Sequence, residues 1–501
     1  MGCVRRPVRE LIPPSRIGVT PGEDAYLKAH MRDGKVYILR SWAVDPELNV
    51  VTGEGKILGI NREPLGSGQF RVPVDSVAIF ETNKLVVSPV VAGMAIITGA
   101  SLAATAICLT NPKACFGSCP TFYASDGDKP ILQAEGFSAS VAPSLEARDV
   151  DALYRARPEQ GRLEIVMRNE ALETHVVRAA NLLFVPHDAQ QRVFADAAGI
   201  TVDNRGFWQT RELVPPTSAA DDRGECAAAV AQFDGLERSS AADSTNLATK
   251  ETVEICFDHV PGGDLGLVVA FRQTLLTTYL FYQTLAYMGG SAGEWFASLE
   301  RAGAPAKDRI AGLGDMIGGI RVLVEERSGI WALRQEIRET GPLATNVVVV
   351  PLDRVVPGPV RVRLQMARGA WRLDMVALTV LEAPAVASRL YPSAVLRDGA
   401  ASETALESLL RANRPLTTLP GDEYTLVYEL PRGNETCELF LETQGYYLEW
   451  MRDEWLQEED HIAAAMLLFD PERAVIEMAP KYKEAEPFME RSFWNSRYAR
   501  P

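Results

Sequence analysis

Apolar and polar residues alternate with a period of two along much of this 501-residue chain, which is the pattern of β-strands with one buried face. Before residue 85 the alternation occurs in three segments that turn-forming sequences separate, Lys35–Trp42, Asn49–Ile60 and Val72–Phe80. These segments predict a small, mostly antiparallel β-domain over residues 1–84.

The alternation stops at residues 85–112, where no residue is charged. A membrane-spanning helix needs about 20 apolar residues, so this stretch predicts a hydrophobic helix long enough to cross a bilayer. Ala95, Gly99 and Ala103 would form a stripe of small residues against a partner helix, such as one from a second copy of the chain. The alternative is an Ala- and Gly-rich core helix. Lys84 and Lys113 flank the two ends equally, so the orientation stays open.

Two β-rich regions, joined by a predicted linker, follow this stretch. Residues 113–214 contain alternating segments such as Arg162–Arg168 and predict a β-sandwich-like domain. Residues 215–250 are rich in Ser, Ala and Asp, which predicts a linker. Residues 251–385 contain strands at hairpin spacing and one helical insertion, and predict a jelly-roll-like β-domain.

The final region, residues 386–501, has mixed periodicity. A β-hairpin near residues 424–441 precedes helical segments, the first of them at Tyr446–Glu459. We therefore predict an α+β region that is mostly helical. The expected fold class is mainly β with α: two β-sandwich or jelly-roll-like domains, a small N-terminal β-domain, a hydrophobic helix and a helical C-terminus.

The charge of the chain excludes one class of partner. The formal net charge is −15 and the pI is near 5.0. Nucleic-acid binding needs clustered Lys and Arg, and no basic run here is longer than Arg5-Arg6. We therefore expect no nucleic-acid partner.

The seven cysteines are too few for a disulfide scaffold in a chain of this length. Only Cys115 and Cys119 are close in sequence, with Phe-Gly-Ser between them. A loop of this size can bring two Cα atoms within about 4.4–6.8 Å, the range for a disulfide. We predict that the two cysteines pair if this part of the protein is outside the cytoplasm.

The sharpest catalytic motif is Gly289-Gly-Ser-Ala-Gly293, which matches the G-x-S-x-G nucleophile elbow and would make Ser291 a nucleophile. His461 is the sole histidine downstream and would be the base. The elbow requires a parallel sheet with crossover helices, whereas residues 319–382 are predicted to be hairpin-linked strands. A glycine-rich turn is the favoured interpretation, and a serine hydrolase is an alternative.

Metal ligands are incomplete in the sequence. Glu170, Glu173 and His175 lie close together, and Glu173 and His175 would share one face of a strand. A third ligand is missing, and the chain has no H-E-x-x-H motif. We expect a hydrogen-bonded structural histidine, no metal and no cofactor.

Four aromatic residues carry a third functional alternative. Trp331, Trp371, Tyr279 and Tyr282 recur near the predicted strands of residues 251–385. If exposed, they would stack on sugar rings as in a carbohydrate-binding module, and if buried they belong to the core. The core is the favoured interpretation.

The N-terminus and the region around Cys119 together indicate a location. Gly2-Cys3, followed by basic and Pro-rich sequence, is similar to a bacterial lipobox without its leader, which makes Cys3 a candidate for lipidation. The segments 119–127, 134–138 and 142–147, together with 33–36 and 74–80, resemble a group of predicted bacterial cell-envelope proteins. In these proteins a lipobox and a small β-domain precede an apolar segment and a Cys-Pro-x-x-Tyr turn that opens a β-domain. The resemblance covers about the first two hundred residues and implies a location but no activity.

The sequence therefore favours a non-enzymatic, membrane-associated protein of the bacterial cell envelope with a binding or assembly role. Its expected partners are the membrane and either a second copy of itself or another envelope protein. The alternatives are a serine hydrolase around Ser291 and a carbohydrate-binding module.

Overall fold

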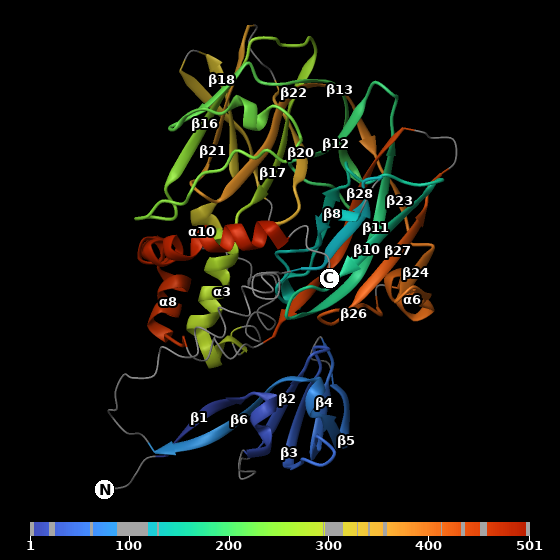
Figure 1. The fold of residues 1–501 in the computed structure, drawn as a ribbon, viewed down its shortest axis with the longest axis vertical. Coiled ribbons are helices and arrows are strands. Elements are labelled where there is room, and N and C mark those ends of the chain that lie inside the picture. The colour runs from blue at the N-terminus through green and yellow to red at the C-terminus, as the bar shows by residue number, and fades with distance from the viewer. Residues whose placement is uncertain are drawn as a thin grey trace.

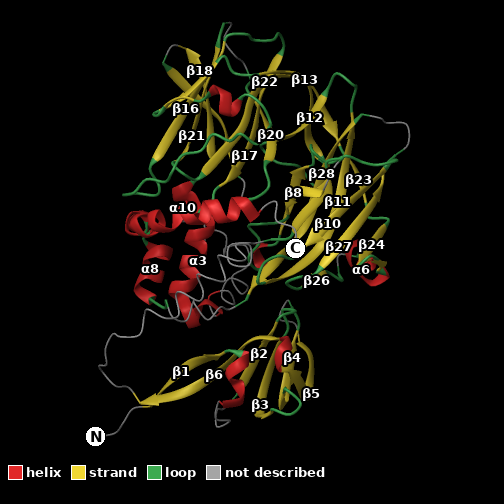
Figure 2. Cartoon of the chain, viewed as in Figure 1, coloured by secondary structure: helices red, strands yellow, loops and turns green. Residues whose placement is uncertain are grey.

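The computed structural model describes residues 5–19, 26–60, 64–87, 119–127, 130–293, 295, 314–327, 329–338, 341–353, 358–411, 413–431, 436–450 and 458–496. The described chain is mainly β, with a group of helices beside the sheets (Figures 1 and 2), which confirms the predicted fold class. No helix among these residues is both long and apolar enough to cross a membrane.

The N-terminal domain is one antiparallel sheet of six strands in the order β1-β6-β2-β3-β4-β5. The strands are β1 (Arg5–Ile12), β2 (Leu27–Met31), β3 (Val36–Asp45), β4 (Val50–Leu58), β5 (Pro64–Pro73) and β6 (Val77–Val87). Inward-facing residues of alternating segments, such as Leu39, Val51 and Phe80, form its core.

Strand β6 corrects the start of the predicted hydrophobic helix. Residues 85–87 belong to β6, where Leu85 pairs with Pro7 and Val87 with Arg5. The β-branched Val86 and Val87 favour a strand when a neighbouring strand offers hydrogen bonds. The rest of the predicted helix, residues 88–112, lies outside the described residues.

The first β-sandwich consists of two packed sheets. One has the order β25-β24-β27-β10-β7-β8, and the other has the order β23-β11-β28-β9, with β26 also paired to β11. Its first half contains β7 (Thr121–Ser125), β8 (Pro130–Glu135), β9 (Ala147–Ala152), β10 (Arg162–Arg168) and β11 (Glu173–Pro186). Its second half contains β23 (Ser388–Leu390), β24 (Ala394–Arg397), β25 (Ala400–Ala401), α6 (Glu403–Leu410), β26 (Leu416–Thr418), β27 (Glu423–Glu429) and β28 (Cys437–Glu449).

The second β-unit, residues 192–386, packs a sheet against a closed five-stranded barrel. The barrel contains β12 (Arg192–Asp196), β13 (Arg205–Val214), β22 (Trp371–Val386), β17 (Asp264–Gln273) and β20 (Asn346–Pro351). The sheet contains β15 (Gly224–Glu225), β14 (Ser218–Asp221), β16 (Lys250–Phe257), β21 (Val360–Ala367), β18 (Ile320–Arg327) and β19 (Ile330–Ile337).

The second β-unit is inserted into the first β-sandwich. After β11 the chain forms the second β-unit and then returns through β23 to complete the first sandwich, where β27 pairs with β10 and β28 with β11. Strand pairing therefore crosses the expected boundary between residues 385 and 386. Residues 215–250, expected to be a linker, contain β14, β15 and the buried Val230 and Leu247.

The C-terminal region differs from its prediction at one point. Residues 446–449, expected to begin a helix, instead end β28, where Tyr446 and Tyr447 are buried and pair with Val176 and His175. Pairing with β11 overrides the helical spacing of these aromatic residues. The later helices are confirmed as α8 (His461–Phe469) and α9 (Pro471–Glu477), which α10 (Ala479–Ser496) follows.

These C-terminal helices contact α3 (Leu276–Met288), the helical insertion of the second β-unit. Asp460 caps α8 by accepting hydrogen bonds from the backbone N–H groups of Ile462 and Ala463. Figure 1 shows α3, α8 and α10 as one group beside the two β-units.

Candidate binding site between the two β-units

A small cavity of about 50 Å³ lies where the first β-sandwich meets the second β-unit. We call it the seam cavity. One wall comes from the edge strand β8 and from the residues that follow β9, and the other comes from loops of the second β-unit. Its lining residues are Ile131, Leu132, Gln133, Ala152, Tyr154, Arg155, Phe233, Leu343 and Thr345.

A β-bulge places Gln133 in this wall. Strand β8 pairs with β7 through Phe122 opposite Ala134 and Tyr123 opposite Leu132, so the register leaves Gln133 without an opposite residue. Bulges redirect side chains and are frequent at sheet edges and beside functional sites. Here the bulge lies on an edge strand and its extra residue lines the cavity.

The side-chain amide of Gln133 is buried without satisfying its hydrogen-bonding capacity. The residue is 6% exposed, and its buried Nε2 atom has no hydrogen-bond partner in the described part of the chain. Most buried polar side chains in native proteins are hydrogen-bonded, and an unsatisfied one lowers stability. Gln133 thus lines the cavity, but its amide nitrogen has almost no accessible surface, so a ligand could bond to it only after a shift of the side chain.

Arg155 is the positive charge of the seam cavity. Its side chain is 39% exposed, and its guanidinium carbon lies 4.5 Å from the centre of the Phe233 ring. The nearest carboxylate is that of Asp374, with 3.9 Å between Nη2 and Oδ2. This distance exceeds that of a hydrogen bond, so the donors of Arg155 remain available.

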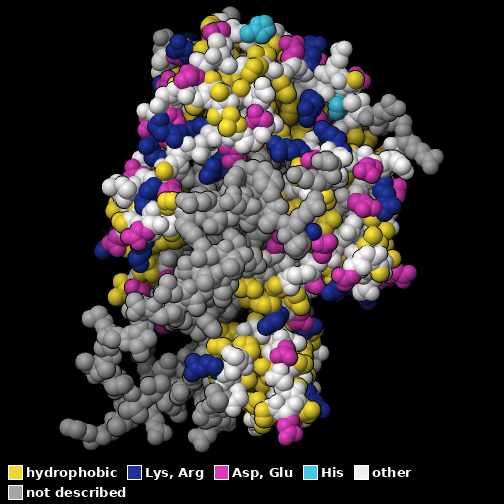
Figure 3. Space-filling view, viewed as in Figure 1, with side chains coloured by type: hydrophobic (Ala, Val, Ile, Leu, Met, Phe, Trp, Pro, Cys, Tyr) yellow, Lys and Arg dark blue, Asp and Glu magenta, His cyan; other side chains and the backbone are white. Residues whose placement is uncertain are grey.

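Backbone hydrogen bonds hold the carboxylate of Asp374 in place. Its Oδ1 atom accepts hydrogen bonds from the backbone N–H groups of Asp234 and Gly235, whereas its buried Oδ2 atom accepts none. Burial raises the pKa of this carboxyl group. On the face shown in Figure 3, basic and acidic side chains are interspersed.

A second buried polar group includes residues that the sequence singled out. His175 Nε2 lies 3.2 Å from Glu173 Oε2, and both side chains are fully buried, so the expected proximity of these two residues is confirmed. Burial lowers the pKa of His175 to about 3, so its imidazole is neutral at pH 7. Glu170 lies apart from this pair and accepts hydrogen bonds from Thr121 and Tyr123.

These buried carboxylates connect the two β-units. The hydroxyl group of Tyr282, on α3, donates a hydrogen bond to Glu449 Oε1 at 2.7 Å. The same hydroxyl oxygen lies 3.3 Å from Glu173 Oε1. Glu135 of β8 accepts hydrogen bonds from the backbone N–H groups of Leu343 and Ala344. No group of three or more His, Cys, Asp or Glu side chains within the described ranges is arranged to hold a metal ion. The arrangement therefore joins the β-units through hydrogen bonds.

Cys119 belongs to the same region. Its thiol is buried, with Sγ 3.8 Å from Glu135 Oε1, and its backbone has a positive φ of 76°. Burial and the nearby Glu135 and Glu173 raise the pKa of this thiol, which opposes thiolate formation. Cys115, its predicted disulfide partner, and Cys3, the lipidation candidate, lie outside the described residues, so both assignments stay predictions.

The hydrolase motif lies in an unfavourable context. Ser291 ends a short 3-10 helix, η5 (Gly289–Ser291), that directly follows α3, whereas a nucleophile elbow follows a strand. The Oγ atom of Ser291 donates a hydrogen bond to the carbonyl of Met288. His461 is exposed at the start of α8, and its Nε2 lies 3.1 Å from Glu459.

The aromatic residues of the carbohydrate alternative do not form a platform. Trp371 and Tyr282 are buried, and Tyr279 packs against Tyr482 at a ring distance of 5.1 Å. Trp331 is half-buried, with the guanidinium of Arg363 3.9 Å from its ring centre.

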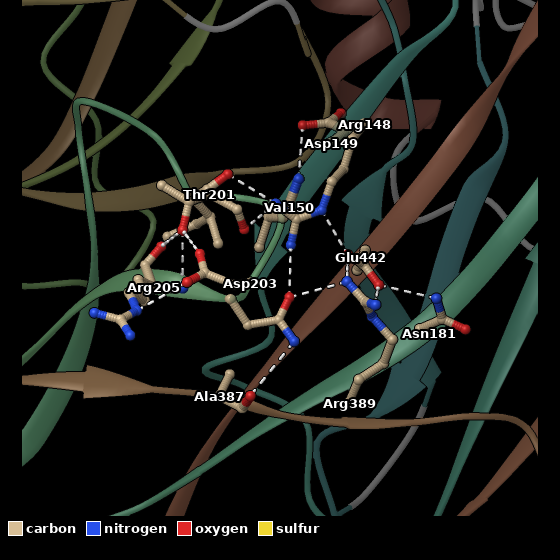
Figure 4. A network of polar contacts seen from close by, with 12 residues as sticks. Arg148, Asp149, Val150, Asn181, Thr201, Asp203, Arg205, Ala387, Arg389 and Glu442 are labelled. Atoms are coloured by element: carbon tan, nitrogen blue, oxygen red, sulfur yellow. Dashed lines mark hydrogen bonds and ion pairs between the residues drawn. The ribbon is translucent and has the colours of Figure 1, made fainter.

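A charged network connects the two β-units (Figure 4). Glu442 of β28 accepts hydrogen bonds from Arg148, Arg389 and Asn181. Arg148 also donates to the carbonyls of Ile200 and Thr201, in the loop between β12 and β13. This network fixes the walls of the seam relative to each other.

Sequence periodicity did not identify the seam residues. Gln133 lies in β8, and a polar residue at a buried position of a strand is its one local signal. Arg155 carries no motif. Gln133 and Arg155 can be recognised as cavity residues only in the folded structure, where the inserted β-unit brings Phe233 and Leu343 against β8.

Comparisons with known proteins add little to this geometry. A scan against protein-family models and a search of curated proteins gave no match. One solved structure that aligns is a β-porphyranase of glycoside hydrolase family 86 from the human gut bacterium Bacteroides plebeius, at 10% sequence identity and a TM-score of 0.16. The alignment covers 52% of this chain and 43% of that enzyme chain, so it spans less than half of the enzyme. A score this low carries no argument about fold or function.

Proposed function

We propose that this chain is a non-catalytic binding protein and that the seam cavity is its ligand site. The observation that carries the proposal is Gln133, a buried amide on a β-bulge that lines the cavity without a hydrogen-bond partner. An amide in this state lowers stability in the free protein, and a ligand that bonds to it would offset that loss.

The chemistry of the lining favours binding over catalysis. Among the described lining residues there is no Ser, Cys, His, Asp or Glu, the usual nucleophiles and general acids or bases. Arg155, Tyr154 and Thr345 carry polar groups that can orient a ligand. Ser291 lies in a different element, at the end of α3.

We further propose that the protein acts at the membrane of the bacterial cell envelope. The support is the uncharged sequence of residues 85–112 and the resemblance of the first two hundred residues to predicted envelope proteins. The test is carbonate extraction of membranes, comparing the whole protein with a variant that lacks residues 88–112. Membrane retention of the whole protein alone supports the proposal, and equal release of both proteins contradicts it.

The test of binding is a fragment screen by saturation-transfer NMR on the whole protein. The fragments include carboxylates, amides, amines and neutral sugars of comparable size. We expect at least one class to bind to the native protein and to lose binding in Gln133→Leu, which keeps the side-chain volume but removes the amide. If no fragment distinguishes the two proteins, the seam cavity is not a ligand site.

A further inference from the structure

We infer that the seam cavity binds the carboxylate end of a small or extended ligand whose adjoining carbon atoms are apolar. This inference rests on the proposed function, because it names the ligand class of the same site. Its basis is the pairing of two donor groups, Arg155 and Gln133, in one cavity with mostly apolar walls.

The donors match a carboxylate. A guanidinium presents N–H groups in a planar fork that binds the two oxygens of a carboxylate. Arg155 makes no hydrogen bond to any other residue that the structure describes. The contact with Phe233 restricts the plane of the fork. The Gln133 amide of the β8 wall adds an N–H donor once its side chain turns toward the ligand. A ligand anion held by both groups would satisfy donors on both sides of the cavity.

The local charge favours one negative charge over two. Asp374 lies 3.9 Å behind Arg155 and partly neutralises it. A dianion such as phosphate would bring two charges toward this buried carboxylate, and repulsion between like charges in a buried site is costly. A monocarboxylate brings only one negative charge toward Asp374, so the repulsion that it meets is smaller than for a dianion.

The size and walls of the cavity limit the rest of the ligand. A volume of about 50 Å³ corresponds to roughly four water-sized groups, since one water needs about 10–15 Å³ by the same measure. A carboxylate with two or three carbon atoms fills this space. Ile131, Leu132, Ala152 and Leu343 line it and suit an alkyl segment better than a hydroxylated one.

The experiment compares propionate with propionamide, its neutral isostere, by saturation-transfer NMR titration of the whole protein at pH 7. We expect propionate to bind at least about tenfold more tightly, because a hydrogen bond to a charged group contributes more than a neutral one. Gln133→Leu and Arg155→Lys should each weaken propionate binding by about tenfold. Lys keeps the charge but cannot bind both oxygens.

The control variant is Arg157→Gln, which removes a nearby arginine that bonds to the carbonyls of Tyr154 and Ala156 and does not line the cavity. It should leave propionate binding unchanged. Circular dichroism and urea unfolding establish that each variant is folded.

The outcomes separate the two proposals. If propionamide binds as tightly as propionate and both are lost in Gln133→Leu, the carboxylate inference is wrong and the binding function stands. If a neutral sugar or an amine binds in a way that depends on Gln133 and propionate does not, the carboxylate inference is again wrong and the binding function again stands. If neither propionate nor any fragment of the wider screen responds to Gln133→Leu, both proposals fail.

Discussion

At the scale of single residues, the unsatisfied amide of Gln133 has a consequence for stability as well as for binding. A buried polar group without a partner lowers stability by about 1–3 kcal/mol. Because Leu has a similar volume and no polar atoms, it can occupy the same space without this loss. A residue that weakens the free protein in this way is typical of a functional site.

The first prediction is that Gln133→Leu raises the free energy of unfolding by about 1–3 kcal/mol. Urea unfolding measures it. The matched control is Gln365→Leu, where the amide is near the surface and accepts a hydrogen bond from Arg321. That change should stay within about 0.5 kcal/mol. A loss of stability in Gln133→Leu would show that the amide has a structural partner and would weaken the proposed role.

The second prediction concerns Ser291, whose hydroxyl proton is used in a hydrogen bond to the Met288 carbonyl at the end of α3. We expect no labelling of this serine by a fluorophosphonate probe, because the hydroxyl has no strand-to-helix elbow to activate it. The comparison is the native protein with Ser291→Ala in a gel assay. Labelling that disappears in the variant would establish the hydrolase alternative.

At the scale of elements, the edge of β8 and the start of β11 depend on buried polar groups that cross from one β-unit to the other. Glu135, Glu173 and Tyr282 form hydrogen bonds between β8, β11 and α3 or its neighbouring loops. His175 lies beside Glu173 with a pKa near 3. This junction therefore responds to pH.

The third prediction follows from the pKa of His175, which burial lowers from 6.5 to about 3. Between these values the unfolded chain binds a proton and the folded chain does not, so stability falls as the pH drops from about 6.5 toward 3. The slope from this histidine is at most about 1.4 kcal/mol per pH unit. Urea unfolding at several pH values should show a shallower slope in His175→Asn than in the native protein. Equal slopes would contradict the lowered pKa.

Local pattern predicted the strands better than their ends. The segments Arg162–Arg168 and Lys35–Trp42 alternate clearly. The first coincides with β10, whereas β3 continues past the second to Asp45. Tyr446 and Tyr447 have spacing that also suits a helix, and only the long strand β11 beside them makes β28 continue to Glu449. The bulge at Gln133 depends on the register with β7, which no local pattern contains.

At the scale of the whole molecule, the network around Glu442 connects the first β-sandwich to the second β-unit (Figure 4). Arg389 and Asn181 approach the same carboxylate from β23 and β11. Burial opposes ionisation of Glu442, but hydrogen bonds from Arg389, Asn181 and Arg148 outweigh it and lower its pKa. The network is therefore ionised at neutral pH.

The fourth prediction is that Glu442→Gln lowers the free energy of unfolding by about 2–4 kcal/mol, because Arg148 and Arg389 lose their shared negative partner in a mostly buried site. Glu164→Gln is the control, since its ion pair with Arg162 is exposed and should contribute less than about 1 kcal/mol. Urea unfolding of both variants tests the contrast. Similar losses in the two would mean that the network does not join the β-units.

The insertion of one β-unit into the other could not be predicted from periodicity. Strands that pair across the insertion, such as β10 with β27, carry the same alternation as strands that pair locally. The partners are chosen by packing between distant segments, so the expected boundaries at residues 214 and 385 follow composition and not the sheets. The seam cavity is a product of that insertion.

The same insertion sets an order of events during synthesis of the chain. Asn181 and Glu442, which bond across β11 and β28, are 261 residues apart. At roughly 5–20 residues per second, a ribosome needs about 13–50 seconds to make the chain between them. The second β-unit emerges whole in that interval, while β10 and β11 wait with open edges. A nascent chain of this protein would therefore be most exposed to aggregation and most dependent on chaperones just before β28 is made.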